Sequence, residues 1–409
     1  MATPNQPPLR IALVCILWIV GWLVVLDLAT GWAVHRIALR NPASGIARYF
    51  EYGLSIETKL DRTTRLPPDA GDAKILKAGW LDPAQWGELP VAARPGSDLF
   101  LAVYGQSFVF NASYEAARLD GHITIRGIGG PAAPPDHSYA AYQLDTGRGH
   151  ADVVVLGILA SSVARMGAIS GASSTFEHPA PFTYPHYVLH DGRLEAIQPV
   201  LRTEQEFRDA FAANSQAWRA FKTQLATYDR GFDPLAFDRT WWDRSQIALL
   251  LRRGWVAHAQ DYSAGIYDPR KGYLADAPQI QVLKAMLVDL ARQSRARGER
   301  LIVLLEHDQG YGASLRRALG PTLEQAHVEY ISTDALFSAD DPRNFVSDGH
   351  FSHDANELLA KALLSALRRR PSVTAPGAAP SAAAPGAVTD AAGVQPVSCT
   401  ASACPGVAK

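Results

Sequence analysis

Residues 152–159 read Asp-Val-Val-Val-Leu-Gly-Ile-Leu, a segment that is apolar throughout after its first residue. A strand with one face in water alternates apolar and polar side chains, whereas a strand covered on both faces is apolar without alternation. The segment therefore predicts a strand that is buried on both faces of a sheet.

Strand-like and helix-like segments alternate on both sides of this run. Strands are expected at Asp98–Tyr104, His122–Ile125, Leu301–Leu305 and Val328–Ile331, and helices at Ser107–Arg118, Asp136–Leu144, Gln279–Arg297, Gly312–Ala326 and His353–Arg369. Such alternation predicts an α/β fold with a mainly parallel sheet and helices on both faces. A long insertion, at about residues 161–278, interrupts the pattern; within it, Thr203–Tyr228 has a polar helical pattern.

The N-terminal segment is apolar enough to cross a bilayer. Ile11–Leu26 carries no charge, and the apolar stretch continues to about Val34 with Asp27 as its only charge. About 20 residues span a membrane. The run is long for a signal peptide, and no small-x-small cleavage site follows it. We therefore expect residues 1–35 to form a cytoplasmic stub and a single transmembrane anchor.

Composition bounds the remaining organisation. A net charge of −1 without basic runs argues against a nucleic-acid partner. Residues 36–97 are expected to form a neck and an irregular lead-in, and residues 98–370 a catalytic domain that contains the insertion. Residues 371–409 are Ala- and Pro-rich and nearly uncharged. They are expected to be disordered, because they offer too little apolar area to offset the entropy of ordering.

Two motifs far apart in the chain carry the candidate chemistry. The apolar run Leu99–Val103 ends in Tyr104-Gly105-Gln106-Ser107, which places a hydroxyl at the edge of the sheet where α/β proteins form their sites. Asp348 and His350 precede the last helix. A serine needs such a base, and an extended segment would turn both side chains the same way. The alternative is a plain turn in which Ser107 caps a helix.

A glycine-rich segment, Arg126-Gly127-Ile128-Gly129-Gly130, lies between these motifs. The order of serine, glycine and Asp-x-His motifs resembles that of the SGNH (GDSL-like) serine hydrolases. The resemblance implies a three-layer α/β/α sandwich of the flavodoxin-like type. It also implies Ser107 as nucleophile, His350 as general base, Asp348 as its orienting partner and the amides of Gly130 and Ser107 as oxyanion donors, with no cofactor. The alternative reading of the glycines is a turn that needs a positive φ angle.

The third motif of that family departs from the pattern. An asparagine is expected after the third strand, but Ala160-Ser161-Ser162 stands there, and Gln106 replaces the usual aspartate before Ser107. We expect Ser161 or Ser162 to donate a hydroxyl to the oxyanion instead. Loss of one such donor can cost about 10²-fold in rate.

Further candidate residues are less specific. Phe176, His178 and Tyr184 belong to an aromatic cluster that either contacts a glycan or fills a small core, and His307 either lines the pocket or is structural. The three residues from Glu306 to Asp308 cannot all face one ion, so no metal site is expected. Trp241, Trp242 and Trp255 are expected to pack in a core.

The resulting expectation is a membrane-anchored serine esterase of the periplasmic face of an inner membrane. Its substrate would be an acylated cell-envelope glycan or another small ester. The charges that flank the apolar segment do not set its orientation. Two alternatives stay open: an O-acyltransferase that modifies an envelope polysaccharide, and a non-catalytic glycan-binding or assembly protein that retains the fold.

Overall fold

A computed structural model describes residues 7–41, 44–66 and 74–369. The chain divides into two units, Met1–Arg368 and Arg369–Lys409, and all elements below belong to the first. The expected disordered tail at 371–409 and the first six residues of the expected stub lie outside the described residues.

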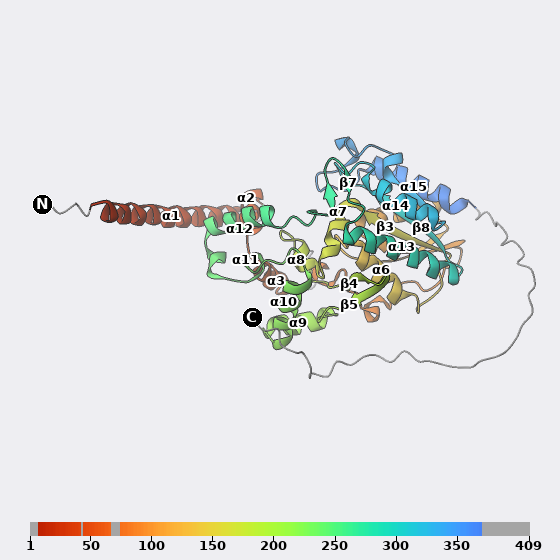
Figure 1. Cartoon of the computed structure of the whole chain (residues 1–409), viewed down its shortest axis with the longest axis horizontal. Coiled ribbons are helices and arrows are strands. Elements are labelled where there is room, and N and C mark those ends of the chain that lie inside the picture. Colours follow the sequence, from red (N-terminus) through yellow and green to blue (C-terminus); the bar gives the residue numbers. More distant parts are fainter. Residues whose placement is uncertain (1–6, 42–43, 67–73, 370–409) are drawn as a thin grey trace, which may run out of the picture. The chain divides into compact units, whose positions relative to one another are not determined.

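A five-stranded sheet organises the larger unit (Figure 1). All neighbouring strands pair in parallel, in the order β2-β1-β3-β8-β9. Their bounds are β1 Leu99–Gly105, β2 Ile123–Gly129, β3 Val153–Leu159, β8 Arg300–Glu306 and β9 Glu329–Ser332. From β1 the chain first adds β2 on one side and then adds β3, β8 and β9 on the other. The direction of winding therefore reverses between β1 and β3. Ligands of doubly wound sheets bind at this switch point, outside the carboxyl ends of the strands.

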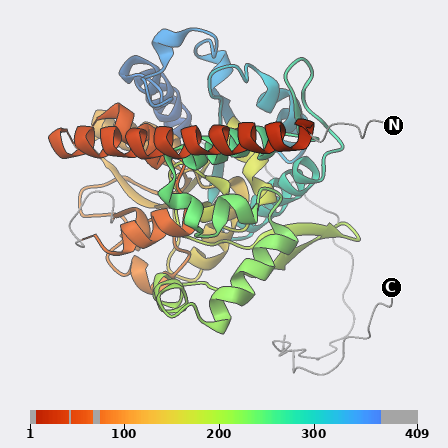
Figure 2. The same ribbon diagram turned by 90° about the vertical axis from the view of Figure 1, so that its left-hand side faces the viewer.

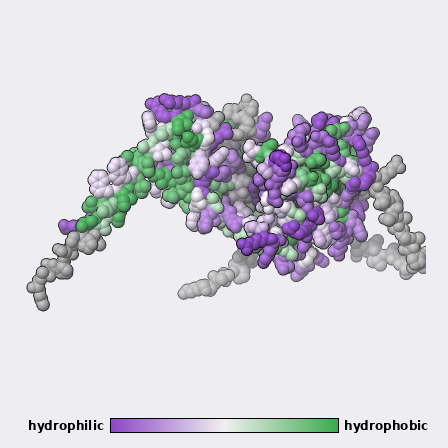
Figure 3. All heavy atoms as spheres, turned by 90° about the horizontal axis from the view of Figure 1, so that it is seen from above, coloured by the Kyte–Doolittle hydropathy of each residue, from purple (hydrophilic) through white to green (hydrophobic). Residues whose placement is uncertain are grey.

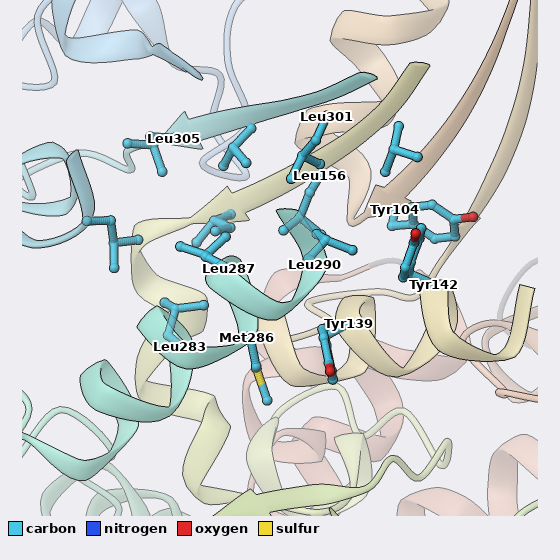
Figure 4. Close-up of a cluster of buried hydrophobic side chains, with 14 of the residues drawn as sticks. Tyr104, Tyr139, Tyr142, Leu156, Leu283, Met286, Leu287, Leu290, Leu301 and Leu305 are labelled. Atoms are coloured by element: carbon cyan, nitrogen blue, oxygen red, sulfur yellow. The ribbon is translucent and has the colours of Figure 1, made fainter. Parts of the chain in front are cut away.

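Helices cover both faces of the sheet, which confirms the three-layer α/β/α sandwich. One core is formed by side chains of α6 Pro135–Asp145, α13 Pro278–Ala296 and α14 Ser314–Gln325 (Figure 4). The other is formed by α5 Ser107–Asp120 and α15 His353–Arg368. The strand β3 contributes to both: Leu156 lies in the first core and Val155 in the second. Its unbroken apolar sequence follows from this double burial.

The segment between β3 and α13 folds into short elements. These are α7 Ala160–Val163, α8 Gly171–Ser174, β4 His186–His190, β5 Arg193–Ile197, α9 Glu204–Ala212, α10 Gln216–Tyr228, α11 Pro234–Phe237, α12 Gln246–Ala259, β6 Tyr267–Asp268 and β7 Gly272–Tyr273. The single helical pattern expected over Thr203–Tyr228 breaks into α9 and α10. Asn214 lies between them with φ of 43°, a conformation that cannot continue a helix.

The residues that precede β1 contribute to a third core shared with this segment. They form α2 Gly45–Glu51, α3 Ile56–Thr64 and α4 Lys74–Lys77. Ile56 and Leu60 of α3 and Trp80 pack in one cluster with Phe207 and Trp218. Short 3₁₀ turns complete the chain at Pro83–Trp86, Ala164–Gly167, Trp241–Arg244, Thr333–Ala335 and Pro342–Asn344.

The first element is the long helix α1, Pro7–Arg40, which Figure 2 shows as one continuous helix. Among the described residues, its part Arg10–Arg40 is the one helix long and apolar enough to cross a membrane. Its exposed side chains between Ile11 and Leu28 are mostly apolar (Figure 3). The carboxylate of Asp27 accepts hydrogen bonds from the Ser245 hydroxyl at 3.0 Å and the Ile247 amide at 2.8 Å, at the start of α12.

Candidate active site

Three residues named by the sequence motifs lie together at the carboxyl edge of the sheet. Ser107 is the first residue of α5, two positions after β1 ends. Its Oγ lies 2.6 Å from Nε2 of His350, although the two residues are 243 positions apart in the chain. The other ring nitrogen, Nδ1, lies 3.0 Å from Oδ1 of Asp348. The distances place a hydroxyl, an imidazole and a carboxylate in one chain of hydrogen bonds.

The two contacts of His350 determine its tautomer. A carboxylate can only accept a hydrogen bond, so Nδ1 carries the proton and donates it to Asp348. The lone pair of Nε2 then faces Ser107, whose hydroxyl donates to it. This is the arrangement in which an imidazole can remove the proton of a serine hydroxyl during attack.

A tight turn, rather than the expected extended segment, brings Asp348 and His350 to the same side. Gly349 has φ of 87°, a left-handed conformation that side chains disfavour. The main-chain N–H of His350 donates to Asp348 Oδ1 at 3.1 Å, and the Val346 amide donates to the His350 carbonyl at 2.8 Å. The first of these bonds, followed by the bond from the imidazole, lowers the pKa of Asp348. Asp348 is therefore held as a carboxylate.

The sequence motifs did not identify Phe108, which supports the imidazole. Its ring stacks on that of His350, with centroids 4.9 Å apart and an interplanar angle of 17°. The edge of Phe351 packs against the same phenyl ring at 4.8 Å. Phe108 follows the candidate nucleophile directly, but nothing in the local sequence indicates that its ring meets a residue near the other end of the domain.

Gly130 ends the glycine-rich segment and lies beside the serine turn, because Gly129 pairs with Gly105 across β2 and β1. Its φ is not in the positive region, so the alternative of a turn needing positive φ is wrong. Glycine is required for another reason: a Cβ here would lie 2.7 Å from Cα of Gly79. Residues 126–129, expected to form the turn, instead continue strand β2.

A buried histidine holds the backbone that packs on Gly130. His137 is fully buried, and its Nε2–H donates to the carbonyl of Gly79 at 2.7 Å. Burial lowers the pKa of His137 to about 4, so its ring is neutral near pH 7. This side chain therefore acts as a fixed brace behind the candidate oxyanion glycine.

The two serines expected to replace the missing asparagine make other contacts. The Ser162 hydroxyl is buried and donates to the carbonyl of Leu159 at 2.7 Å. The amide of Ser161 donates to Oδ1 of Asp308 at 3.0 Å. Burial raises the pKa of Asp308. In this conformation the Ser162 hydroxyl donates its hydrogen bond within its own turn and not to an oxyanion. Among the described contacts, none joins Ser161 to Ser107.

The residues at the end of β8 are buried rather than exposed to a pocket. His307 is 1% exposed, and its Nδ1 and main-chain N–H both contact the hydroxyl of Thr333. Glu306 is fully buried, and neither carboxyl oxygen has a hydrogen-bond partner among the described residues. Burial raises its pKa well above the usual range. Within the described ranges no three His, Cys, Asp or Glu residues are grouped so as to hold a metal ion.

A cavity of about 470 Å³ begins just after Gly130. It is lined by Pro131, Ala132, Arg165, Ser174, Thr175, Phe176, Glu177, His178, Ala180, Arg253, Val256 and Ala257. Phe176 and His178, which were expected near the catalytic pocket, line this cavity, but Ser107, Asp348 and His350 do not. Tyr184 does not line it either, because it is fully buried in the third core. A larger cavity of about 850 Å³ lies against α3 and α10 and includes none of the three residues at the sheet edge.

Comparisons with known proteins place this chain near no characterised family. No protein-family model matches it, and no curated protein matches it. Among solved structures, the crystal structure of a proposed acylhydrolase from Bacteroides fragilis is similar, with 10% sequence identity and a TM-score of 0.35. The match covers 69% of this chain and 92% of the other. A likeness this weak does not indicate an activity, so the function rests on the residues at the sheet edge.

Proposed function

We propose that this protein is a serine esterase of the SGNH type, with residues of about 98–370 as its catalytic region. The observation that carries the proposal is the pair of hydrogen bonds from Ser107 through His350 to Asp348, at 2.6 and 3.0 Å. The sequence order of the three motifs and the place of Ser107 at the switch point of the sheet support it.

The proposed reaction proceeds in two steps. Ser107 Oγ attacks the ester carbonyl while its proton moves to Nε2 of His350, and the amides of Ser107 and Gly130 stabilise the negative oxygen. The bond to the leaving alcohol breaks as the alcohol takes that proton. Water then attacks the acyl-serine, passes a proton through His350, and releases the acid and the serine hydroxyl. Asp348 stabilises the imidazolium in both steps.

The exposure of the site favours a large substrate. The side chains of His350 and Asp348 are 34% and 68% exposed, so the catalytic groups lie at an open surface. An open site admits an ester on a chain longer than the site itself. Together with a membrane anchor on α1, this supports an acylated glycan of the cell envelope as substrate. A substrate of that kind would require the catalytic region to lie on the periplasmic side of the inner membrane.

The direct test is covalent labelling with a fluorophosphonate probe, together with hydrolysis of a chromogenic acetyl ester. We expect the label on the peptide that contains Ser107, and loss of label and hydrolysis in Ser107→Ala. His350→Gln should slow labelling at least 100-fold because the serine loses its base. The control is His353→Gln, a histidine three positions further along that is exposed at the start of α15. Its labelling should equal that of the parent.

Absence of label in a folded sample would overturn the esterase and favour a glycan-binding protein. One observation favours that alternative. The Ser162 hydroxyl, expected as one of two replacements for the missing asparagine, donates its hydrogen bond to the Leu159 carbonyl and not toward the oxyanion position. Label without hydrolysis, followed by transfer of the acyl group to an added polysaccharide, would identify an acyltransferase instead.

A further inference from the structure

The helix α12 presents an apolar surface to the outside of the protein. Leu250, Leu251 and Trp255 are 38%, 62% and 49% exposed. The other exposed positions of this helix are Gly254, Ala257, His258 and Ala259. Just before the helix, Trp241 is 72% exposed, so the expectation that Trp241 and Trp255 pack in a core is wrong.

The charged residues of α12 point the opposite way. Arg252 is 1% exposed, and its guanidinium forms an ion pair with Asp243 at 2.5 Å. Arg253 pairs with Glu177 at 2.8 Å and lies over the ring of Tyr49 at 4.1 Å. A helix on the surface of a water-soluble protein turns its charges outward and its leucines inward. The reversed arrangement indicates that the outer face of α12 contacts an apolar environment rather than water.

Contacts with α1 place α12 at a defined level along the apolar helix. The Asp27 carboxylate accepts hydrogen bonds from Ser245 and Ile247, at the N-terminus of α12. From Arg10 to Asp27 the helix rises by about 25 Å. A bilayer has a hydrocarbon core about 30 Å thick. With Arg10 at one boundary, Asp27 and the start of α12 therefore lie within about 5 Å of the other.

The chemistry around this level matches a membrane boundary. A carboxylate is costly inside hydrocarbon but tolerated at its edge, and two donors at a helix N-terminus stabilise it further. Trp and Tyr side chains collect at such boundaries, and Trp241, Trp255 and Tyr49 are all at least 49% exposed. Arg36, Arg40, Arg48 and Arg244 follow or flank the same region in sequence. Basic side chains at a membrane boundary can extend their charged ends to the headgroups.

We propose that the outer face of α12, together with Trp241, lies in the headgroup region of the bilayer and forms a second membrane contact beside α1. This inference rests on the proposed anchoring of the chain by α1. Its functional consequence is that the protein is held to the membrane along two helices that hydrogen-bond to each other, so the body cannot swivel freely about the end of α1.

The test uses the full chain in liposomes of phosphatidylethanolamine and phosphatidylglycerol, with Cys15, Cys399 and Cys404 replaced by Ser. An environment-sensitive fluorophore is attached at Leu251→Cys. The matched control is Leu358→Cys on α15, another helical leucine, 46% exposed. A third label at Leu17→Cys reports on α1 itself. We expect quenchers carried by the lipids to reduce the emission of the labels at 17 and 251 severalfold, and iodide in the water to quench the label at 358.

Each outcome separates this inference from the anchor on which it rests. Lipid quenching at 17 with iodide quenching at 251 would overturn the α12 contact and leave the anchor intact. Iodide quenching at both positions would overturn both. A label at 251 that neither quencher reaches, with chemical crosslinks between copies, would mean that a second copy of the chain covers this face, and would also overturn the proposal.

Discussion

Among the single residues of the site, Arg126 shows how a motif position can serve the structure rather than the reaction. It opens the glycine-rich segment that resembles the second motif of the SGNH hydrolases, yet its side chain is only 2% exposed. Its Nε lies 2.7 Å from the Asp145 carboxylate, which also accepts a 2.6 Å hydrogen bond from the Tyr104 hydroxyl. The guanidinium therefore neutralises the buried carboxylate of Asp145 at the end of α6. Because it is buried, it cannot contact a substrate.

We therefore expect Arg126→Ala to lower the free energy of unfolding by about 3–5 kcal/mol, because it leaves Asp145 buried without its closest cation. Urea unfolding followed by circular dichroism measures the change. Arg118→Ala provides the control, since Arg118 is 64% exposed and pairs with Glu115 on the surface. A surface pair of this kind is worth at most about 1 kcal/mol. Equal effects of the two variants would contradict the assignment.

His137 predicts a pH dependence of stability. Burial lowers its pKa from 6.5 to about 4 in the folded state, so the unfolded chain binds this proton first as the pH falls. Its contribution is fully present above pH 6.5 and is lost between pH 6.5 and 4, by an amount of order 3 kcal/mol. The denaturation midpoint, measured at pH 7.5, 6, 5 and 4, should depend less steeply on pH in His137→Gln than in the parent. An unchanged slope in that variant would show that other groups cause it.

Among the elements, the turn from Asp348 to His350 sets the orientation of the imidazole that is proposed as the base. Gly349 has φ of 87°, and a side chain there strains the backbone by about 1–2 kcal/mol. Relief of that strain would move Asp348 away from Nδ1 of His350. This turn, not the helix that follows it, holds the two side chains in register.

We expect Gly349→Ala to reduce kcat for ester hydrolysis at least 10-fold while changing KM little, because the imidazole loses its orienting partner. The control is Gly298→Ala between α13 and β8, where φ is 71° and a Cβ would have nothing within 4 Å. Both variants impose a similar backbone strain, so both should lose similar stability. Only the first should lose turnover, measured as initial rates per folded molecule.

The sequence predicted the sheet and its helices well because their signals are local. The runs that became β1, β3 and β8 are apolar over the length of a strand, and α13 has its leucines at helical spacing. β2 was expected to end at Ile125 because glycines usually mark turns, but pairing with β1 extends it to Gly129.

The stack of Phe108 on His350 and the hydrogen bond from His137 to Gly79 join residues distant in sequence, so no local pattern indicates them. Helical periodicity also cannot tell an exposed apolar face from one that packs in a protein core, as Trp255, 49% exposed, illustrates.

In the molecule as a whole, the neck before β1 and the insertion after β3 share one core. Trp80 packs against Phe207 with ring centroids 5.8 Å apart, and the Trp218 indole donates to Glu57 of α3 at 2.9 Å. Segments more than a hundred residues apart thus stabilise each other in a core of their own, while Trp86 of the same lead-in also packs in a core of the central sheet. The expected neck and the insertion therefore fold around the same hydrophobic core.

This arrangement predicts that Trp218→Ala, which removes a fully buried indole, loosens both segments together. We expect faster hydrogen–deuterium exchange in α3 and α10 and unchanged protection in β1 and β3, with a loss of about 3–5 kcal/mol in local stability. Trp241→Ala is the control, because Trp241 is 72% exposed. Faster exchange in α10 alone would show that the neck folds without the insertion.

The separation of Ser107 from His350 also has a consequence for biosynthesis. The two residues are 243 positions apart, and at about 5–20 residues per second their synthesis is separated by about 10–50 s. During that interval the chain already contains the proposed nucleophile and the apolar α1, but not the imidazole proposed to activate the serine. On the proposed function and anchoring, a nascent chain therefore stays inert while α1 enters the membrane. A chain that ends early, before residue 350, carries a serine that never becomes reactive.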